Sequence, residues 1–169
     1  MIVLQTERLR LRHMTDDDAA FMLALLNDPA YHRFIGDRGV RTVEAARDYM
    51  RNGAMAMVAR LGFGFYIVER KEDGRPIGVS GLAKRDFLDD VDIGYAFLPE
   101  YGRQGYAIEA AVGVLAHARA LGLKRLVASV RPDNSASIRV LEKLGLRFER
   151  SFQAPQTACE LHLFAMEIA

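Results

Sequence analysis

The stretch with the clearest chemical content runs from Val91 to Ala110 and reads VDIGYAFLPEYGRQGYAIEA. A strand-like run ends at Pro99, a loop with Gly102 and Gly105 follows, and a helical pattern then begins. Such a loop directs bare backbone N–H groups toward one point, with a helix dipole behind them, and glycine lets an anion approach closely. The expected ligand is a phosphate or pyrophosphate. The spacing is neither a P-loop nor G-x-G-x-x-G, so on spacing alone a strand-to-helix turn without a ligand is slightly favoured.

A second stretch, Arg131 to Leu146, reads RPDNSASIRVLEKLGL. Asn134 stands directly ahead of an amphipathic helix, where its simplest role is an N-cap. Ser137 falls in the first turn of the same helix, where a polar surface residue is ordinary. These residue types alone therefore do not separate a ligand site from a helix start.

The elements that position these stretches alternate between strands and helices. The pattern predicts a strand over Leu9–Arg12, then a helix that Thr15 caps and Asn27-Asp28-Pro29 stops. A second helix is expected from Thr42 through Tyr49 and on toward Arg60. This order predicts a mixed α/β sheet with helices on both faces. The remaining expected strands are Phe63–Glu69, Pro76–Leu82, Val91–Leu98, Arg125–Val130, Leu146–Phe152 and Cys159–Ile168, and the remaining helices are Gly105–Leu121 and Asn134–Leu144.

Length and charge exclude several classes of protein. The 169 residues fit one domain over 1–169, and 23 basic against 22 acidic residues argue against a nucleic-acid binder. No segment has the apolar length of a signal peptide or membrane span, so we expect a soluble, cytoplasmic protein with no membrane partner. The lone Cys159 excludes a disulfide framework, and the four histidines show no metal-ligand spacing, so no metal is expected.

Four segments together resemble the GNAT superfamily of acetyl-CoA-dependent N-acetyltransferases, most closely its RimJ/RimL-like branch. They are Thr6–Arg12, Gly94–Ala110, Asn134–Gly145 and Glu160–Met166, and they occur in the family's order over nearly the whole chain. The resemblance implies a twisted mixed sheet, largely antiparallel, with helices on both faces. The sheet would splay open as a V between the fourth and fifth strands of the fold, here the strands over 91–98 and 125–130, and acetyl-CoA would sit in that V.

The resemblance also implies which residues hold acetyl-CoA. The pantetheine amides would pair with the backbone of Phe97 and Leu98, and Asn134 would hydrogen-bond the pantetheine arm. Gly102 departs from the family, which usually has Gln, Arg or Trp there, so a side-chain contact is lost. The pyrophosphate would bind the N–H groups of Arg103, Gln104, Gly105, Tyr106 and Ala107, while Arg139 and Lys143 would face the phosphates or equally well be solvated surface cations.

Catalytic roles follow from the same matching. Asp92 occupies the position where several members place a glutamate base, and a solvated charge at a hairpin end is an equal alternative. Because Asp is shorter than Glu, a bridging water would be needed; Asp89 and Asp90 are alternative bases. The family's acidic tyrosine is replaced by Leu141, and Ser137 matches the serine of RimL-like enzymes. Direct acetyl transfer is expected, since Cys159 has no matched base.

The function expected from the resemblance is transfer of acetyl from acetyl-CoA to a primary amine, either a protein N-terminal α-amine or a small-molecule amine. The alternative is a catalytically silent, CoA-binding GNAT-like sensor, which the missing tyrosine and Gly102 keep open. Acceptor identity is expected to depend on the two early helices, the Ala30–Arg41 loop and the Phe87–Asp90 turn. A homodimer is left open.

Overall fold

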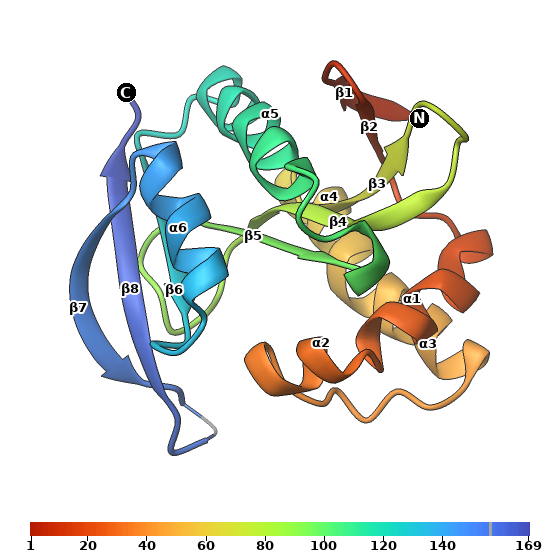
Figure 1. Ribbon diagram of the computed structural model, residues 1–169, viewed down its shortest axis with the longest axis horizontal. Coiled ribbons are helices and arrows are strands. Elements are labelled where there is room, and N and C mark those ends of the chain that lie inside the picture. Colours follow the sequence, from red (N-terminus) through yellow and green to blue (C-terminus); the bar gives the residue numbers. More distant parts are fainter. Residues whose placement is uncertain (156) are drawn as a thin grey trace.

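The computed structural model describes residues 1–155 and 157–169. It contains an eight-stranded sheet in the spatial order β1-β2-β3-β4-β5-β6-β8-β7 (Figure 1). Within the described residues every neighbouring pair is antiparallel except β5 and β6, which are parallel. The strands are β1 (Ile2–Gln5), β2 (Leu9–Arg12), β3 (Phe65–Arg70), β4 (Pro76–Ala83), β5 (Asp92–Phe97), β6 (Arg125–Val130), β7 (Arg147–Gln153) and β8 (Glu160–Glu167).

The parallel pair β5–β6 is joined at one position only. Asp92 lies opposite Val127, and the Val127 N–H donates to the Val91 carbonyl at 3.1 Å. By contrast, β5 is paired with β4 along its whole length, and β6 is paired with β8 in the same way. Beyond Asp92 the two strands therefore part, which opens the sheet between them (Figure 1). The V-shaped mixed sheet predicted from the resemblance is confirmed.

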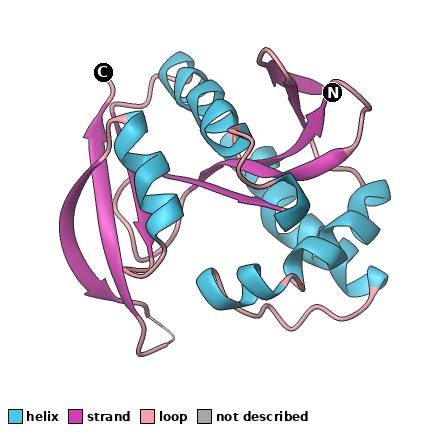
Figure 2. Cartoon of the chain, in the orientation of Figure 1, coloured by secondary structure: helices cyan, strands magenta, loops and turns pink. Residues whose placement is uncertain are grey.

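Two helices cover one face of the sheet. Helix α5 (Tyr106–Ala120) packs on β4 and β5, and α6 (Ser135–Leu144) packs beside it on β6 (Figure 2). Small buried residues of α5, including Ala110, Ala111 and Val114, let it approach the strands closely. No helix among the described residues combines the length and the apolar character that crossing a membrane requires.

The helices that precede β3 lie mainly against the opposite face, although Met57 and Val58 pack against the core under α5. Alternation along β3 shows the division, because Tyr66 and Val68 belong to the core under α5 whereas Ile67 packs with the early helices. These early elements are η1 (Asp16–Asp18), α1 (Ala19–Leu26), α2 (Pro29–Phe34), α3 (Val43–Met50), η2 (Arg51–Met55) and α4 (Ala56–Leu61). The helix expected from Thr42 toward Arg60 is thus present as α3, η2 and α4, with a π-helical turn around Gly53.

Three details differ from the sequence-based expectation. Strand β1 was not expected, and neither was α2, which begins where the Asn27-Asp28-Pro29 signal was expected only to end a helix. The Asp28 carboxylate accepts hydrogen bonds from Ala30 N (3.0 Å) and Tyr31 N (3.3 Å), so the stop signal is also an N-cap. Cys159 precedes β8 rather than opening it, and it is half-buried.

The contact between β3 and β4 generates a stability prediction at Gly81. A Cβ there would lie 2.2 Å from the Gly64 carbonyl oxygen and 2.7 Å from Phe65 Cα, both backbone atoms that cannot turn aside. We expect Gly81→Ala to lower the free energy of unfolding by about 1–3 kcal/mol, the usual cost of overpacking. Gly53→Ala is the matched control, because a Cβ at Gly53 meets nothing within 4 Å. Denaturant unfolding with equal midpoints for both variants would contradict this account.

Candidate active site

The edge of β5 that faces the opening offers free peptide groups. The Leu98 N–H is committed to the Ile77 carbonyl of β4 (3.0 Å), whereas the Val91 carbonyl points toward β6. Because peptide groups alternate in direction along a strand, those of Tyr95 and Phe97 point into the opening, beyond the one pair that Asp92 forms with Val127. The predicted backbone site at Phe97 therefore faces the gap. The N–H of Leu98 does not, whereas the peptide group of Tyr95 faces the gap as well.

The loop before α5 has the backbone shape of an anion cradle. Arg103 (φ 60°) and Gly105 (φ 78°) both adopt the left-handed conformation, which is uncommon for a non-glycine residue such as Arg103. The first hydrogen bond of α5 runs from Glu109 N to the Gly105 carbonyl (3.1 Å), so the helix itself leaves the preceding N–H groups free. The residues predicted to bind pyrophosphate, Arg103, Gln104, Gly105, Tyr106 and Ala107, make up this turn.

Arg8, which lies near the N-terminus, fixes this loop. Sequence analysis did not single out this residue. Its guanidinium donates to the Gln104 carbonyl (2.9 Å) and to Glu109 (2.6 Å), and it lies 4.3 Å from the centre of the Tyr106 ring. Glu109 also accepts from the Thr6 hydroxyl at 2.5 Å. Burial opposes ionisation of Glu109, but these hydrogen bonds outweigh it and hold the pKa of its carboxyl below the usual value. The loop is therefore held in shape before any ligand arrives.

Asn134 and Ser137 lie on the other arm of the opening. The Asn134 side-chain oxygen accepts from the Ser137 N–H at 3.3 Å, so Asn134 is the N-cap of α6. That bond uses the oxygen of the amide and leaves its NH₂ group available as a donor. The structure therefore shows the N-cap role, and the free NH₂ group leaves room for the second role expected from the sequence.

Tyr95 of β5 joins the two arms and is a second residue that sequence analysis missed. Its hydroxyl lies 2.8 Å from Ser137 Oγ and 3.3 Å from the Ser137 carbonyl oxygen. Burial raises the pKa of Tyr95 to about 12, and its hydrogen bond to Ser137 opposes the shift only weakly. Tyr95 therefore stays protonated at neutral pH.

Asp92 is buried at the base of the opening, 3% exposed. Its Oδ2 accepts from Arg85 Nε at 3.0 Å, and its Oδ1 has no hydrogen-bond partner within the described part of the chain. Burial raises the pKa of Asp92 above its ordinary value, although the Arg85 guanidinium opposes this. A buried carboxylate with one free oxygen is a far better candidate base than a solvated charge at a hairpin end. Of the alternatives, Asp89 is exposed and Asp90 is bound to Arg125 (3.1 Å).

The remaining predicted positions lie on the same elements. Arg139 and Lys143 are exposed on α6, and neither forms an ion pair with a described residue. Leu141, where the family has its tyrosine, is 2% exposed and part of the core. A Cβ at Gly102 would lie 3.1 Å from the Pro99 carbonyl oxygen, which gives a steric reason for glycine there. Residues 1–155 and 157–169 contain no group of three His, Cys, Asp or Glu side chains that could hold a metal ion.

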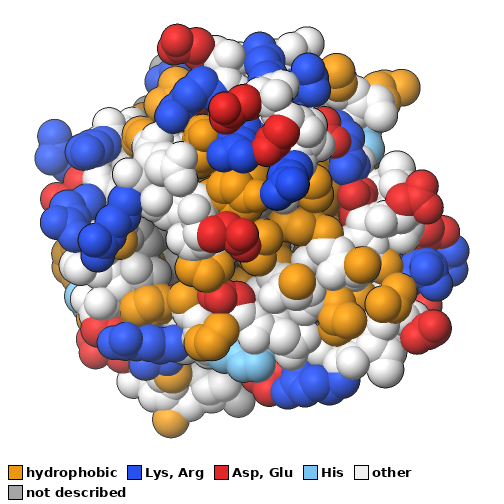
Figure 3. Space-filling view, turned by 45° about the vertical axis from the view of Figure 1, so that its right-hand side comes forward, with side chains coloured by type: hydrophobic (Ala, Val, Ile, Leu, Met, Phe, Trp, Pro, Cys, Tyr) orange, Lys and Arg blue, Asp and Glu red, His pale blue; other side chains and the backbone are white. Residues whose placement is uncertain are grey.

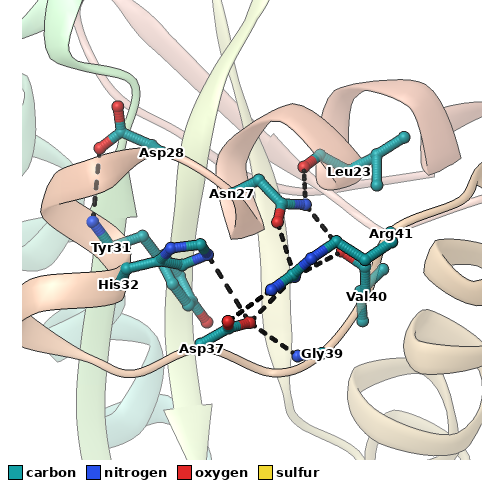
Figure 4. A network of polar contacts seen from close by, with 9 residues as sticks. All are labelled: Leu23, Asn27, Asp28, Tyr31, His32, Asp37, Gly39, Val40 and Arg41. Carbon is teal, nitrogen blue, oxygen red and sulfur yellow. Dashed lines mark hydrogen bonds and ion pairs between the residues drawn. The ribbon is translucent and has the colours of Figure 1, made fainter.

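The loop after α2, expected to influence the acceptor, is held by a polar network (Figure 4). The Asn27 amide donates to the Leu23 and Val40 carbonyls, while Arg41 binds Asp37. From α2 itself, Arg33 reaches to 3.6 Å from Asp133, in the loop that leads into α6. Helix α2 thus contacts the loop between β6 and α6, on the other side of the opening from β5. Figure 3 shows hydrophobic side chains gathered in a hollow near the centre of one face, with charged side chains along its rim.

Comparison with known proteins identifies the class. Residues 8–147 match the acetyltransferase (GNAT) domain family. The uncharacterized N-acetyltransferase YoaA of Bacillus subtilis is 34% identical over 150 residues, covering 87% of this chain and 84% of its own. The uncharacterized protein YkkB of the same organism is 31% identical over 156 residues, covering 89% and 88%. The chain belongs to the GNAT family and is an acetyl-CoA-dependent acyltransferase.

Solved structures agree with this assignment. A GNAT-family acetyltransferase from Bacillus anthracis has a TM-score of 0.81 at 25% identity, covering 99% of both chains. RimL, a ribosomal L7/L12 α-N-protein acetyltransferase solved in complex with coenzyme A, has a TM-score of 0.86 and covers 99% of this chain and 98% of its own. At 18% identity, the RimL likeness shows the shared fold.

The Asn134 side chain caps α6 through its oxygen and leaves its NH₂ group free, which generates a prediction about coenzyme A. Asn134→Ser keeps an N-cap oxygen but removes the amide donor, whereas Asn134→Ala removes both. We expect both variants to raise the Kd of coenzyme A about five- to ten-fold, the value of one hydrogen bond. Only the alanine variant should also lose about 1 kcal/mol of stability. Calorimetric titration and thermal unfolding measure the two effects. Wild-type affinity in Asn134→Ser would reduce Asn134 to a cap.

Proposed function

We propose that this protein transfers the acetyl group of acetyl-CoA directly to a primary amine, either the α-amine of a protein N-terminus or that of a small molecule. The observation that carries the proposal is the opening of the sheet after Asp92. Free peptide groups of β5 line one arm, and the Asn134 amide and Ser137 hydroxyl line the other. We also propose that the chain acts as one domain and belongs to the RimJ/RimL-like branch, whose structures are among its fold neighbours.

The residues present suit the thioester and its phosphate-bearing tail. In this proposal the peptide groups of Tyr95 and Phe97 pair with the pantetheine amides as an added strand would, and Asn134 donates to the same arm. The turn with left-handed Arg103 and Gly105 binds the pyrophosphate through backbone N–H groups. The exposed cations Arg139 and Lys143 of α6 add charge near the phosphates.

The proposed base is Asp92. Amines are mostly protonated at pH 7, so attack requires removal of a proton. The free Oδ1 of Asp92 accepts it through a bridging water, and the raised pKa makes the carboxylate a stronger base than a solvated aspartate. Asp92 and Tyr95 differ by three positions on one strand, so their side chains lie on opposite faces of β5. The base and Ser137 then act from opposite sides of the thioester.

Ser137 serves the departing sulfur. As the new C–N bond forms and the C–S bond breaks, negative charge builds on sulfur, and the Ser137 hydroxyl donates a hydrogen bond to it. The proton that the amine loses passes through Asp92 to solvent, and the thiolate takes its proton from solvent. No acyl-enzyme is needed, because the amine attacks the thioester directly. The sulfur of half-buried Cys159 accepts a hydrogen bond from the Arg131 guanidinium at 3.4 Å.

The direct test is thiol release from acetyl-CoA with a panel of small amines and N-terminal peptides. We expect saturable release with at least one acceptor and a mass gain of one acetyl group on its amine. Acetyl-CoA at 100 times its Kd should also stabilise the protein by about 2.7 kcal/mol. Saturable cofactor binding with no release for any acceptor would contradict catalysis and favour a silent sensor.

Asp92→Asn tests the base and should separate activity from stability. We expect kcat to fall about 100-fold at neutral pH, as for loss of a general base. Because burial raises the pKa of Asp92, ionisation costs the folded state stability as pH rises through that pKa. Asparagine does not ionise, so the variant should match wild type near pH 3 and exceed its melting temperature at pH 8.

The matched control is Asp86→Asn, which removes the same charge from an exposed position in the loop that leads into β5. It should change neither kcat nor the pH dependence of stability. An Asp92→Asn enzyme with wild-type kcat would exclude Asp92 as the base, whatever its stability.

A further inference from the structure

The hydroxyl of Tyr95 lies within hydrogen-bonding distance of one side chain, that of Ser137. The side chain leaves β5 on the α5 and α6 face, in the same row as Ile93 and Phe97, and packs half-buried against the core. Its hydroxyl lies 2.8 Å from Ser137 Oγ and 3.3 Å from the Ser137 carbonyl oxygen. The contact crosses the opening between β5 and α6, at the place where the thioester is proposed to lie.

The chemistry of the two hydroxyls decides which one donates. A phenol is a stronger acid and a better hydrogen-bond donor than an aliphatic alcohol. Burial raises the pKa of Tyr95 to about 12, so the phenol keeps its proton across the physiological range. The Ser137 carbonyl can also accept from the Tyr95 O–H, but at 3.3 Å it is farther away than Ser137 Oγ at 2.8 Å. With the Tyr95 hydrogen on the nearer Oγ, the hydrogen of Ser137 is left to point elsewhere. The Asn134 oxygen already accepts from the Ser137 N–H, so the backbone of Ser137 is fixed as well.

We infer that Tyr95 is a positioning residue for acetyl transfer: by donating to Ser137 Oγ it turns the Ser137 hydrogen toward the leaving sulfur. This inference rests on the proposed function. Tyr95 does not itself supply the proton, because a thiolate whose conjugate thiol has a pKa near 8.5 is too weak a base to deprotonate such a phenol. Its proton stays on oxygen throughout, while the C–S bond breaks and the thiolate is protonated by solvent.

A structural clasp between β5 and α6 is the competing explanation, and kinetics separates the two. Tyr95→Phe keeps the ring and removes the hydroxyl. We expect kcat to fall about five- to ten-fold, with KM for acetyl-CoA and Kd for coenzyme A within two-fold of wild type. Ser137→Ala should lower kcat about ten-fold. The double variant should be no slower than Ser137→Ala, since both changes remove the same hydrogen bond to sulfur.

Tyr66→Phe is the matched control. Tyr66 is a buried tyrosine under α5. Its hydroxyl pairs with His117 of that helix (3.2 Å) rather than with Ser137 of α6. It should lose stability comparably to Tyr95→Phe but keep wild-type kcat. A fall in kcat confined to Tyr95→Phe and Ser137→Ala supports the inference.

Three results would overturn it. They are wild-type kcat in Tyr95→Phe, additive losses in the double variant, or a loss in Tyr95→Phe that appears in Kd and melting temperature but not in kcat. If the wild-type protein releases no thiol with any acceptor, the proposed function fails and the inference fails with it. Turnover by wild type with an unaffected Tyr95→Phe enzyme rejects the inference alone.

Discussion

The hydrogen-bond ladder between β5 and β6 ends after one pair, and the rest of the site depends on that ending. A sheet normally satisfies every interior peptide group by pairing it with a neighbour. Here the peptide groups of Tyr95 and Phe97 in β5 face an opening instead, while β5 and β6 each stay paired on their other side. Unpaired but ordered peptide groups are a template for a ligand that carries amides of its own. The fold thus creates a binding edge in the middle of a sheet without exposing a long free strand to other chains.

The two arms of the opening carry different kinds of chemistry. The β5 arm supplies backbone groups, the anion cradle before α5, and the buried carboxylate of Asp92. The α6 arm supplies side-chain polar groups, Asn134 and Ser137, which its own N-cap holds in place. The Tyr95 hydroxyl and the Arg33–Asp133 ion pair connect the arms from opposite faces. A polyanionic ligand can therefore be bound by a protein whose overall charge is close to neutral.

Local signals explain what could be predicted from the sequence. Strand and helix positions were correct where alternation, caps and glycine stops agreed, as at Leu9–Arg12 and Asn134–Leu144. Strand β1 was missed because a short N-terminal run has no such boundary signals, and α2 because Asn27-Asp28-Pro29 serves as both stop and start. Which of Phe97 and Leu98 turns its peptide group toward the opening depends on the register between β4 and β5. Arg8 and Tyr95 act through partners that are distant in sequence. No local pattern encodes those contacts.

The Arg8–Glu109 contact ties the shape of the loop before α5 to the order in which the chain is made. Its two ends are 101 residues apart, so the clamp joins the first hairpin to α5 across the central strands. Because closing so long a loop is entropically costly, we expect the clamp to form late in folding. A partly folded chain can already contain α5 and yet hold its N-terminal turn loosely. The shape of this turn is then a property of the finished molecule, and a ligand bound there as proposed would stabilise contacts between its earliest and middle segments.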